Sequence, residues 1–343
     1  MIAPAPPGGV AWPNLHPYWI QVAVALPVAA VLGFVVRAVG PRVGALDHPD
    51  AELKPHERAV SYLGGLAVAG GVAAGIATHG WPLPLGASVA LGGAVALGLA
   101  DDALRVPPVV RLIVQVGLGA ALVLWGWSPD TPDGFLMAVP YVVFFVAALN
   151  AVNMVDGMDG LAGTLAVLSA AGIAAVGETA THHRPAMLAV CLAAAAGGFL
   201  VHNLPPARLF LGDNGAYLVG AALAVAAFQV GNSVAALAGA TGCLGVFLLD
   251  LVLSILRRLT GRVPMHRGDR SHLYDQLRAR GRSVWGTLAV CAGAQVAFVA
   301  AGVIAANLPK VGAVVVEGAV WAAAVGALFA FGFVTARTPA RVR

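Results

Sequence analysis

The stretch LNAVNMVDGMDGLAGT, residues 149–164, places four polar side chains directly after the apolar run VPYVVFFVAA. Asn150, Asn153, Asp156 and Asp159 follow one another at three-residue intervals. In a helix, positions three apart differ in direction by about 60°, so the first three side chains fan across one face. Carboxylate and amide oxygens are ligands of hard ions such as Mg2+. The segment therefore predicts either a metal site or a polar helix junction held by interhelical hydrogen bonds, and both remain open.

Two further acidic segments have a similar character. The sequence ADD at 100–102 ends a predicted apolar span, where the helix dipole disfavours negative charge and adjacent carboxylates repel each other. A divalent cation or a Lys or Arg partner would relieve both effects, so we interpret Asp101 and Asp102 as functional rather than as a solvated pair. In FLGDNG at 210–215, Asp213 can ligate an ion. Phe210 can stack on a nucleobase, with core packing as its alternative.

A long basic loop, RRLTGRVPMHRGDRSHLYDQLRARGR at 257–282, offers partners for phosphate. Arg267, Arg270 and His272 are interpreted in this way, because guanidinium and imidazolium groups form charge-assisted hydrogen bonds to phosphate. Asp250 lies about two turns before the loop, and we interpret it as a partner for one of the loop's arginines, without a role in the chemistry. Another polar segment, LDHPDAELKPHERAVSYLGG at 46–65, joins the first two apolar runs.

The elements that carry these segments are strongly apolar. Of 343 residues, 59% are hydrophobic and 10% are charged, whereas a soluble domain carries about 25% charged residues. Runs of about 20 apolar residues, the length that crosses a bilayer core, recur along the chain. We predict an all-α polytopic integral membrane protein that forms a single domain over residues 1–343. About eleven transmembrane helices are expected, at 18–39, 61–78, 85–100, 109–127, 135–150, 161–177, 186–203, 214–231, 233–256, 284–306 and 312–334.

The basic residues predict how these spans are oriented. Of the 20 Lys and Arg residues, all but Arg184 and Lys310 fall in loops on one side, which the positive-inside rule makes cytoplasmic. The N-terminus is then outside and the C-terminus cytoplasmic, and the polar segments lie in cytoplasmic loops at about 40–60, 101–108, 151–160, 204–213 and 257–283. We expect an active site on the cytoplasmic face of a bacterial inner (plasma) membrane. The net charge of +4 favours anionic headgroups or phosphorylated ligands and gives no case for nucleic acid.

The order of these motifs resembles the polyprenyl-phosphate N-acetylhexosamine-1-phosphate transferases, the MraY/WecA group. The resemblance runs from about Leu46 to Gln276, and the predicted eleven spans with an external N-terminus are similar to the WecA branch. It rests on DHPDAELKPH, LGG, DD, NAVNMVDGMDGLAG, FLGDNGAYLVG and LDLVLSILRRLTGRVPMHRGDRSHLYDQL. The resemblance implies transfer of a sugar 1-phosphate from a UDP-N-acetylhexosamine, UDP-GlcNAc first, to a polyprenyl phosphate. The products are a polyprenyl-diphospho-sugar and UMP, as a first membrane step of cell-wall or surface-glycan synthesis.

The resemblance also implies roles for the residues that match its motifs. Mg2+ is the implied cofactor, with Mn2+ as an alternative, and Asn153 and Asp213 are its ligands. The implied catalytic residues are Asp101, Asp102, Asp213 and His272. The implied nucleotide-binding residues are Phe210, Asp156, Asp159 and Asn150, and the implied phosphate-binding residues are Lys54, His56, Arg111 and Arg270. Whether Asp101 or Asp102 acts as a base is left open, as is assembly into a homodimer.

Departures from the family pattern bear on the substrate. The sequence DRSHLYD has Tyr274 and Asp275 where WecA-type members often carry further histidines, and Leu53 stands where an Arg is expected before Lys54. The adjacent histidines of MraY-type members do not occur in this loop, which argues against a phospho-MurNAc-pentapeptide substrate. A membrane transporter of a phosphorylated or anionic solute is the second alternative. Its polar site is expected near the bilayer midplane, whereas the polar segments here gather at one face.

Overall fold

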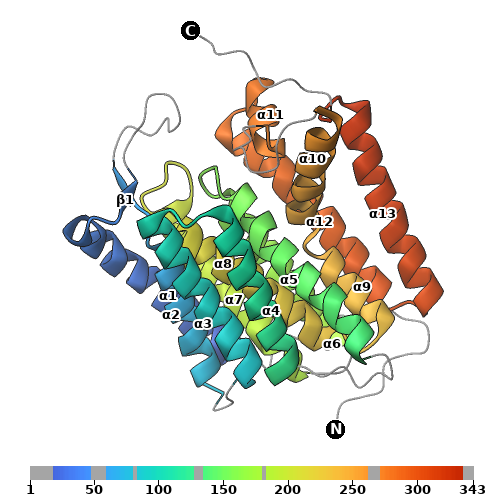
Figure 1. Cartoon of the computed structure of the whole chain (residues 1–343), viewed down its shortest axis with the longest axis horizontal. Helices are drawn as coiled ribbons and strands as arrows, with labels where there is room; N and C mark the ends of the chain where they lie inside the picture. The colour runs from blue at the N-terminus through green and yellow to red at the C-terminus, as the bar shows by residue number, and fades with distance from the viewer. Residues whose placement is uncertain are drawn as a thin grey trace.

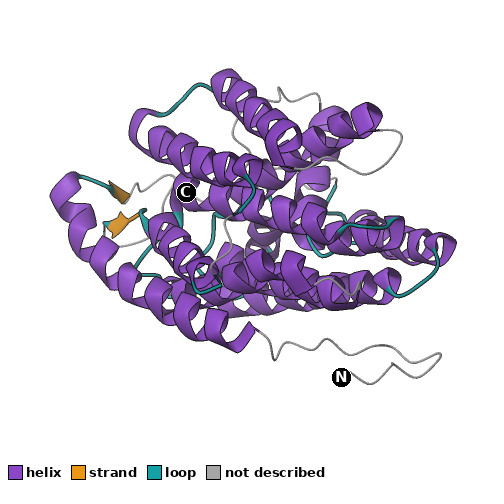
Figure 2. Cartoon of the chain, turned by 90° about the horizontal axis from the view of Figure 1, so that it is seen from below, coloured by secondary structure: helices purple, strands orange, loops and turns teal. Residues whose placement is uncertain are grey.

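The computed structural model describes residues 18–47, 59–79, 83–126, 134–179, 183–261 and 271–334, which are almost entirely helical (Figure 1). Figure 2 shows one small strand pair beside the helices. The first part of the chain comprises α1 (Trp19–Val39), η2 (Gly40–Val43), β1 (Leu46–Asp47), β2 (Val60–Ser61), α2 (Gly64–Ala77), α3 (Leu85–Leu104), α4 (Pro108–Gly126) and α5 (Gly134–Val155). The second part comprises α6 (Leu161–Thr179), α7 (His183–Asn203), α8 (Gly212–Val230), α9 (Val234–Gly242), α10 (Gly245–Gly261), α11 (Leu273–Ala279), α12 (Val284–Ala306) and α13 (Lys310–Ala330).

The helices confirm an all-α polytopic membrane protein. Eight helices in the described residues are long and apolar enough to cross a membrane, or nine if α9 and α10 form one span. Helix α2 is apolar but has only 14 residues. Every predicted span coincides with a helix, although the exact number of crossings stays a prediction. The span predicted at 233–256 consists of two helices, α9 and α10, which meet at an angle of 73°.

Helix α8 lies at the centre of the bundle. All but three of its 19 residues are buried, and it packs against α2, α3, α5, α6 and α7. A helix that is buried on all sides is expected to be apolar all round, so the polar residues of its first turns stand out. By contrast, large apolar side chains such as Phe34, Leu124 and Val311 are exposed on α1, α4 and α13. In a membrane protein, such side chains face lipid.

One end of the bundle collects the polar connections. The α3–α4, α5–α6 and α7–α8 connections, the β1–β2 pair and α11 all lie at the upper end in Figure 1. Helix α1 starts at the other end, where the Tyr18 hydroxyl donates to Glu178 Oε1 at 2.7 Å. Just after α13, the Phe333 carbonyl accepts from Gln276 Nε2 of α11 at 3.0 Å. The described chain therefore starts at one end of the bundle and finishes at the other.

Backbone pairing determines where α8 begins. Strand β2 pairs antiparallel with β1, and the Phe210 N–H donates to the Ser61 carbonyl at 2.8 Å. The Gly64 N–H in turn donates to the Phe210 carbonyl at 2.9 Å. Gly212 then has a φ of 73°, and a Cβ at this position would collide with the Tyr62 carbonyl. Only glycine adopts this left-handed conformation without strain, so Gly212 lets the chain turn into α8 directly before Asp213.

Gln295 of α12 satisfies the backbone at the break between α9 and α10. Its Nε2 donates to the Cys243 carbonyl at 2.5 Å and to the Ser169 hydroxyl at 3.0 Å, while its Oε1 accepts from the Val246 N–H at 3.0 Å. A broken helix at membrane depth is tolerated only where protein groups or water satisfy the freed backbone. The fully buried side chain of Gln295 meets that requirement on both sides of the break.

Replacing Gln295 with Leu should therefore destabilise the protein. The Cys243 carbonyl and Val246 N–H would lose their partner, and each unsatisfied buried group costs about 1–3 kcal/mol. Thermal unfolding of the purified protein in detergent measures the effect. Thr287→Val is a matched control on the same helix, because Thr287 is fully buried and its hydroxyl has no hydrogen-bond partner in the described part of the chain. A Gln295→Leu protein that melts with the wild type would contradict the role of Gln295.

Candidate active site

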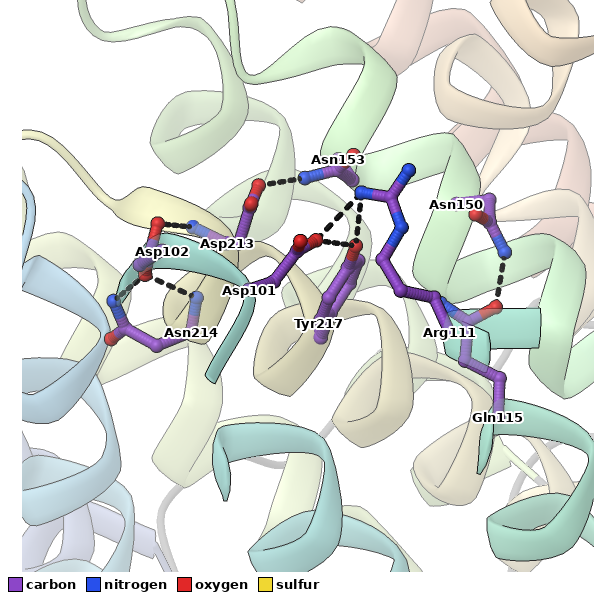
Figure 3. A network of polar contacts seen from close by, with 9 residues as sticks. All are labelled: Asp101, Asp102, Arg111, Gln115, Asn150, Asn153, Asp213, Asn214 and Tyr217. Atoms are coloured by element: carbon purple, nitrogen blue, oxygen red, sulfur yellow. Dashed lines mark hydrogen bonds and ion pairs between the residues drawn. The ribbon is translucent and has the colours of Figure 1, made fainter. Parts of the chain in front are cut away.

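Asp102 caps the N-terminus of α8. Its carboxylate accepts from the backbone N–H groups of Asp213 at 3.0 Å and Asn214 at 3.1 Å, and from Asn214 Nδ2 at 2.7 Å (Figure 3). The first N–H groups of a helix lack partners within the helix, and the helix dipole favours negative charge there. The carboxylate at the unfavourable end of α3 is therefore stabilised by the favourable end of α8. The Asn214 amide also donates to the Tyr62 carbonyl at 2.9 Å, which ties the cap to the start of α2.

Asp101 has a different kind of partner. Its Oδ2 accepts from Arg111 Nη1 at 2.6 Å and from the Tyr217 hydroxyl at 2.9 Å, and Arg111 Nη1 lies 3.2 Å from that hydroxyl. The Asp101 side chain is 4% exposed and that of Arg111 is 29% exposed. The sequence predicted that a cation or a basic partner would relieve the repulsion between Asp101 and Asp102. Arg111 provides this for Asp101, and the α8 N-terminus provides it for Asp102.

The third carboxylate of the cluster is Asp213, which accepts from Asn153 Nδ2 at 2.5 Å. The negative charges of Asp101 and Asp102 act on Asp213. Asp156 follows the end of α5, and its desolvation, together with the charges of Asp213 and Asp102, raises its pKa well above the ordinary value. Carboxyl groups from α3, α8 and the α5–α6 connection thus gather in one place, beside the Asn153 amide of α5. Such a group of carboxyls favours a cation.

The other two residues of the motif at 149–164 are used differently. Asn150 Nδ2 donates to Gln115 Oε1 at 2.7 Å and to the Val146 carbonyl at 2.8 Å, which joins α5 to α4. Asp159 accepts from the Ala207 N–H at 2.9 Å, which joins the α5–α6 connection to the α7–α8 connection. Both side chains therefore make structural contacts, and their predicted roles in nucleotide binding stay predictions. The predicted stacking residue Phe210 is half-buried beside the same connections.

His272 is placed by a carboxylate that the sequence did not assign to it. Its Nδ1 lies 2.7 Å from Asp250 Oδ2, and Asp250 Oδ1 accepts from the Leu273 N–H at 2.6 Å. The expected pairing of Asp250 with an arginine stays a prediction, because several of the arginines of that loop lie outside the described residues. Within the described residues, α11 folds back over α10 and brings His272 to Asp250. The Tyr274 ring stacks on His272, and its hydroxyl packs so closely on Gly157 that a Cβ there would collide with it. Helix α11 thus covers the α5–α6 connection.

Several predicted residues cannot be placed. Lys54, His56, Arg267 and Arg270 lie outside the described residues, so their predicted roles in phosphate binding are neither supported nor contradicted. Of the residues that are described, the structure brings together Asp101, Asp102, Arg111, Asn153 and Asp213 in one cluster, shown in Figure 3. Tyr217 and Asn214 also belong to this cluster but were not predicted. Tyr217 follows Asp213 by four positions, which places both on one face of a helix, and this spacing is the signal that could have identified it.

The cluster lies at one end of an apolar helix bundle and combines carboxylates, an amide and a guanidinium, the groups used to handle phosphates and their counter-ions. The contiguous stretch that supplies it, residues 84–231, matches the model of glycosyl transferase family 4. The chain belongs to this family, in the MraY/WecA group of polyprenyl-phosphate sugar-1-phosphate transferases, and is an enzyme of the transferase class.

Three relatives show what the chain is similar to. A Streptomyces coelicolor protein described as a glycosyltransferase is 33% identical over 332 residues, or 92% of this chain and 76% of the relative. The decaprenyl-phosphate N-acetylglucosaminephosphotransferase of Mycobacterium tuberculosis is 30% identical over 72% of each chain. The phospho-N-acetylmuramoyl-pentapeptide-transferase of a Picosynechococcus species is 30% identical over 72% of this chain and 73% of the relative.

The contact between Asp250 and His272 should be energetically coupled. Replacing Asp250 with Ala leaves the Leu273 N–H and His272 Nδ1 without their acceptor, and residues in one buried network typically show coupling of about 0.5–3 kcal/mol. A double-mutant cycle of Asp250→Ala and His272→Ala, followed by unfolding titrations in mixed detergent, measures the coupling. The two substitutions should together destabilise the protein by less than the sum of their separate effects. Simple additivity would show that the pair does not hold α11 in place.

Proposed function

We propose that the protein transfers N-acetylglucosamine 1-phosphate from UDP-GlcNAc to a polyprenyl phosphate, releasing UMP, on the cytoplasmic face of a bacterial plasma membrane. The observation that carries the proposal is the contact of Asn153 with Asp213 beside the Asp101–Arg111 pair. This arrangement places a carboxylate and an amide, whose oxygens can bind a cation, beside a guanidinium that can bind phosphate. The distribution of basic residues supports a cytoplasmic location, and the names of the mycobacterial and Picosynechococcus relatives support a polyprenyl carrier or an amino-sugar donor.

Mg2+ is the proposed cofactor, and the donor set fits it. No group of three or more His, Cys, Asp or Glu side chains among the described residues is arranged to hold a metal ion. Mg2+ does not need such a group, because it usually binds one or two protein oxygens together with substrate phosphates and water. Asp213 and the Asn153 amide would hold it, and the nearby charges of Asp101 and Asp102 add to the attraction. When bound, the ion neutralises charge on the phosphoryl group in transfer.

The protein's own residues position the reacting groups. An oxygen of the polyprenyl phosphate attacks the β-phosphorus of UDP-GlcNAc, and the bond from that phosphorus to the bridging oxygen of UMP breaks. Phosphoryl transfer of this kind depends on positioning and electrostatic stabilisation more than on covalent participation by the enzyme. Arg111 is partly exposed at the cluster and would bind phosphate oxygens. Asp101 holds Arg111, while Asp102 holds the start of α8 and therefore Asp213.

One observation favours a second class of sugar donor, the muramyl-pentapeptide nucleotide. The Picosynechococcus relative, 30% identical, is named as a phospho-N-acetylmuramoyl-pentapeptide-transferase. The loop at 257–282 lacks the adjacent histidines of MraY-type members, which keeps UDP-GlcNAc as the first choice. A transporter is disfavoured, because the polar cluster lies at one end of the bundle rather than at its middle. A panel of UDP-sugars that includes the muramyl-pentapeptide donor separates the two enzyme candidates.

The first test concerns the substrates and the metal. UMP release from UDP-GlcNAc should require both polyprenyl phosphate and Mg2+, because the proposed reaction needs an acceptor and charge neutralisation. The purified protein in detergent is incubated with each component omitted in turn, and UMP is measured by chromatography. EDTA should abolish release, and added Mg2+ should restore it. UMP release that persists without polyprenyl phosphate or after EDTA treatment would contradict the proposal.

The second test separates the two asparagines of the motif. Asn153→Ala and Asp213→Asn should each reduce turnover by roughly tenfold or more while leaving the fold intact, since each 1.36 kcal/mol of lost transition-state stabilisation is about tenfold in rate. Asn150→Ala is the matched control, because Asn150 joins α5 to α4. We expect it to lower thermal stability more than turnover per folded molecule. Higher Mg2+ should partly rescue Asn153→Ala, and near-normal turnover of folded Asn153→Ala at low Mg2+ would exclude the ligand role.

A further inference from the structure

Tyr217 joins three helices at the edge of the active site. It lies on α8 one turn after Asp213, is 1% exposed, and is among the largest fully buried side chains. Its hydroxyl contacts Asp101 of α3 and Arg111 of α4 (Figure 3). A buried tyrosine hydroxyl usually needs a hydrogen-bond partner, and here it has two charged ones. Its ring is enclosed by the core, so the hydroxyl cannot move away from them.

The three side chains meet through one atom each. The Arg111 side chain makes both of its hydrogen bonds, to Asp101 and to Tyr217, through Nη1. Asp101 accepts from Arg111 and from Tyr217 through the same oxygen, Oδ2. A guanidinium has five N–H donors, so most of its donors take no part in this contact. Figure 3 shows the second terminal nitrogen of Arg111 directed away from both Asp101 and Tyr217. The contact with Asp101 is therefore one-sided, through a single nitrogen.

This geometry differs from the pairing that an arginine and a carboxylate usually form. Arginine and a carboxylate often pair through two parallel hydrogen bonds, which occupy both carboxylate oxygens and two guanidinium nitrogens. The Tyr217 hydroxyl donates to the same Asp101 oxygen and lies 3.2 Å from the same Arg111 nitrogen. The hydroxyl thereby holds Arg111 Nη1 and Asp101 Oδ2 in their present contact. The guanidinium cannot rotate into the two-bond arrangement without losing its contact with the hydroxyl.

We propose that Tyr217 is a positioning residue that holds Arg111 on Asp101 through one nitrogen and so presents the rest of the guanidinium to a substrate phosphate. The inference rests on the proposed function, in which both substrates carry phosphate. Without the hydroxyl, Arg111 would turn onto Asp101 and its free donors would be lost to the substrate. The phosphate belongs either to the polyprenyl phosphate or to the diphosphate of the UDP-sugar.

The direct test is Tyr217→Phe, which removes the hydroxyl and keeps the ring. We expect kcat/KM to fall by about tenfold to a hundredfold, the range for a lost hydrogen bond to charged groups. The KM of one substrate should account for most of the loss, and separate titrations of polyprenyl phosphate and UDP-GlcNAc identify which phosphate Arg111 binds. Tyr141→Phe is the matched control, because Tyr141 is also buried, on α5, and packs against Phe228 away from the cluster. It should keep wild-type kinetics.

A second measurement distinguishes positioning from a general structural role. Lysine cannot form the two-bond pair, so Arg111→Lys should be much less harmful in the Tyr217→Phe background than in the wild type. Strong non-additivity in the KM of the same substrate supports the inference. Additive effects, or a Tyr217→Phe enzyme with wild-type KM values for both substrates, would overturn it.

The proposed function is tested separately by the wild-type enzyme. If wild-type UMP release needs polyprenyl phosphate and Mg2+, the proposed function stands whatever Tyr217→Phe does. Wild-type kinetics in Tyr217→Phe would then overturn the role of Tyr217 alone. If the wild type shows no such dependence, the proposed function fails, and the role of Tyr217 in presenting Arg111 to a substrate phosphate fails with it.

Discussion

Three carboxylates that meet at the end of an apolar helix bundle repel one another, and each needs a compensating group. Asp101 receives a guanidinium, Asp102 receives the N-terminus of α8, and Asp213 receives an amide. These compensating groups come from three different helices. The convergence of α3, α4, α5 and α8 at this end of the bundle is therefore a requirement of the charges as well as a result of apolar packing.

Close backbone approach makes these contacts possible. A Cβ at Gly98, one turn before Asp102 on α3, would collide with the backbone of Asn214 on α8. A Cβ at Gly65 of α2 would likewise collide with the backbone of Gly215 on α8. Helices that meet at small residues can approach closely, as is common in membrane proteins. The Asp102 side chain is short, and it reaches the first N–H groups of α8 because no side chain separates the two helices at Gly98.

How much of the structure could be predicted from the sequence depends on how far apart in the chain the interacting residues lie. Apolar runs predicted the helices because hydropathy is a local property, and the acidic motifs predicted the cluster because each is compact in sequence. The break between α9 and α10 depends on Gln295, which lies about 50 residues further along the chain, and no local pattern marks it. The Asp250–His272 pair also depends on α11 folding back over α10. Tyr217 was missed for another reason, since an apolar run makes a tyrosine look like part of the core.

The motif at 149–164 shows why its two interpretations could not be separated in advance. A step of three residues turns a helix by a little less than a full revolution, so Asn150 and Asn153 face different neighbours. Asn150 meets Gln115 on α4, and Asn153 meets Asp213 on α8. The helix-junction interpretation therefore describes the contacts of Asn150, while the cation site at Asn153 and Asp213 stays a proposal. Helix α5 supplies both amides because it packs between α4 and α8. Its rotation directs Asn150 towards α4 and Asn153 towards α8.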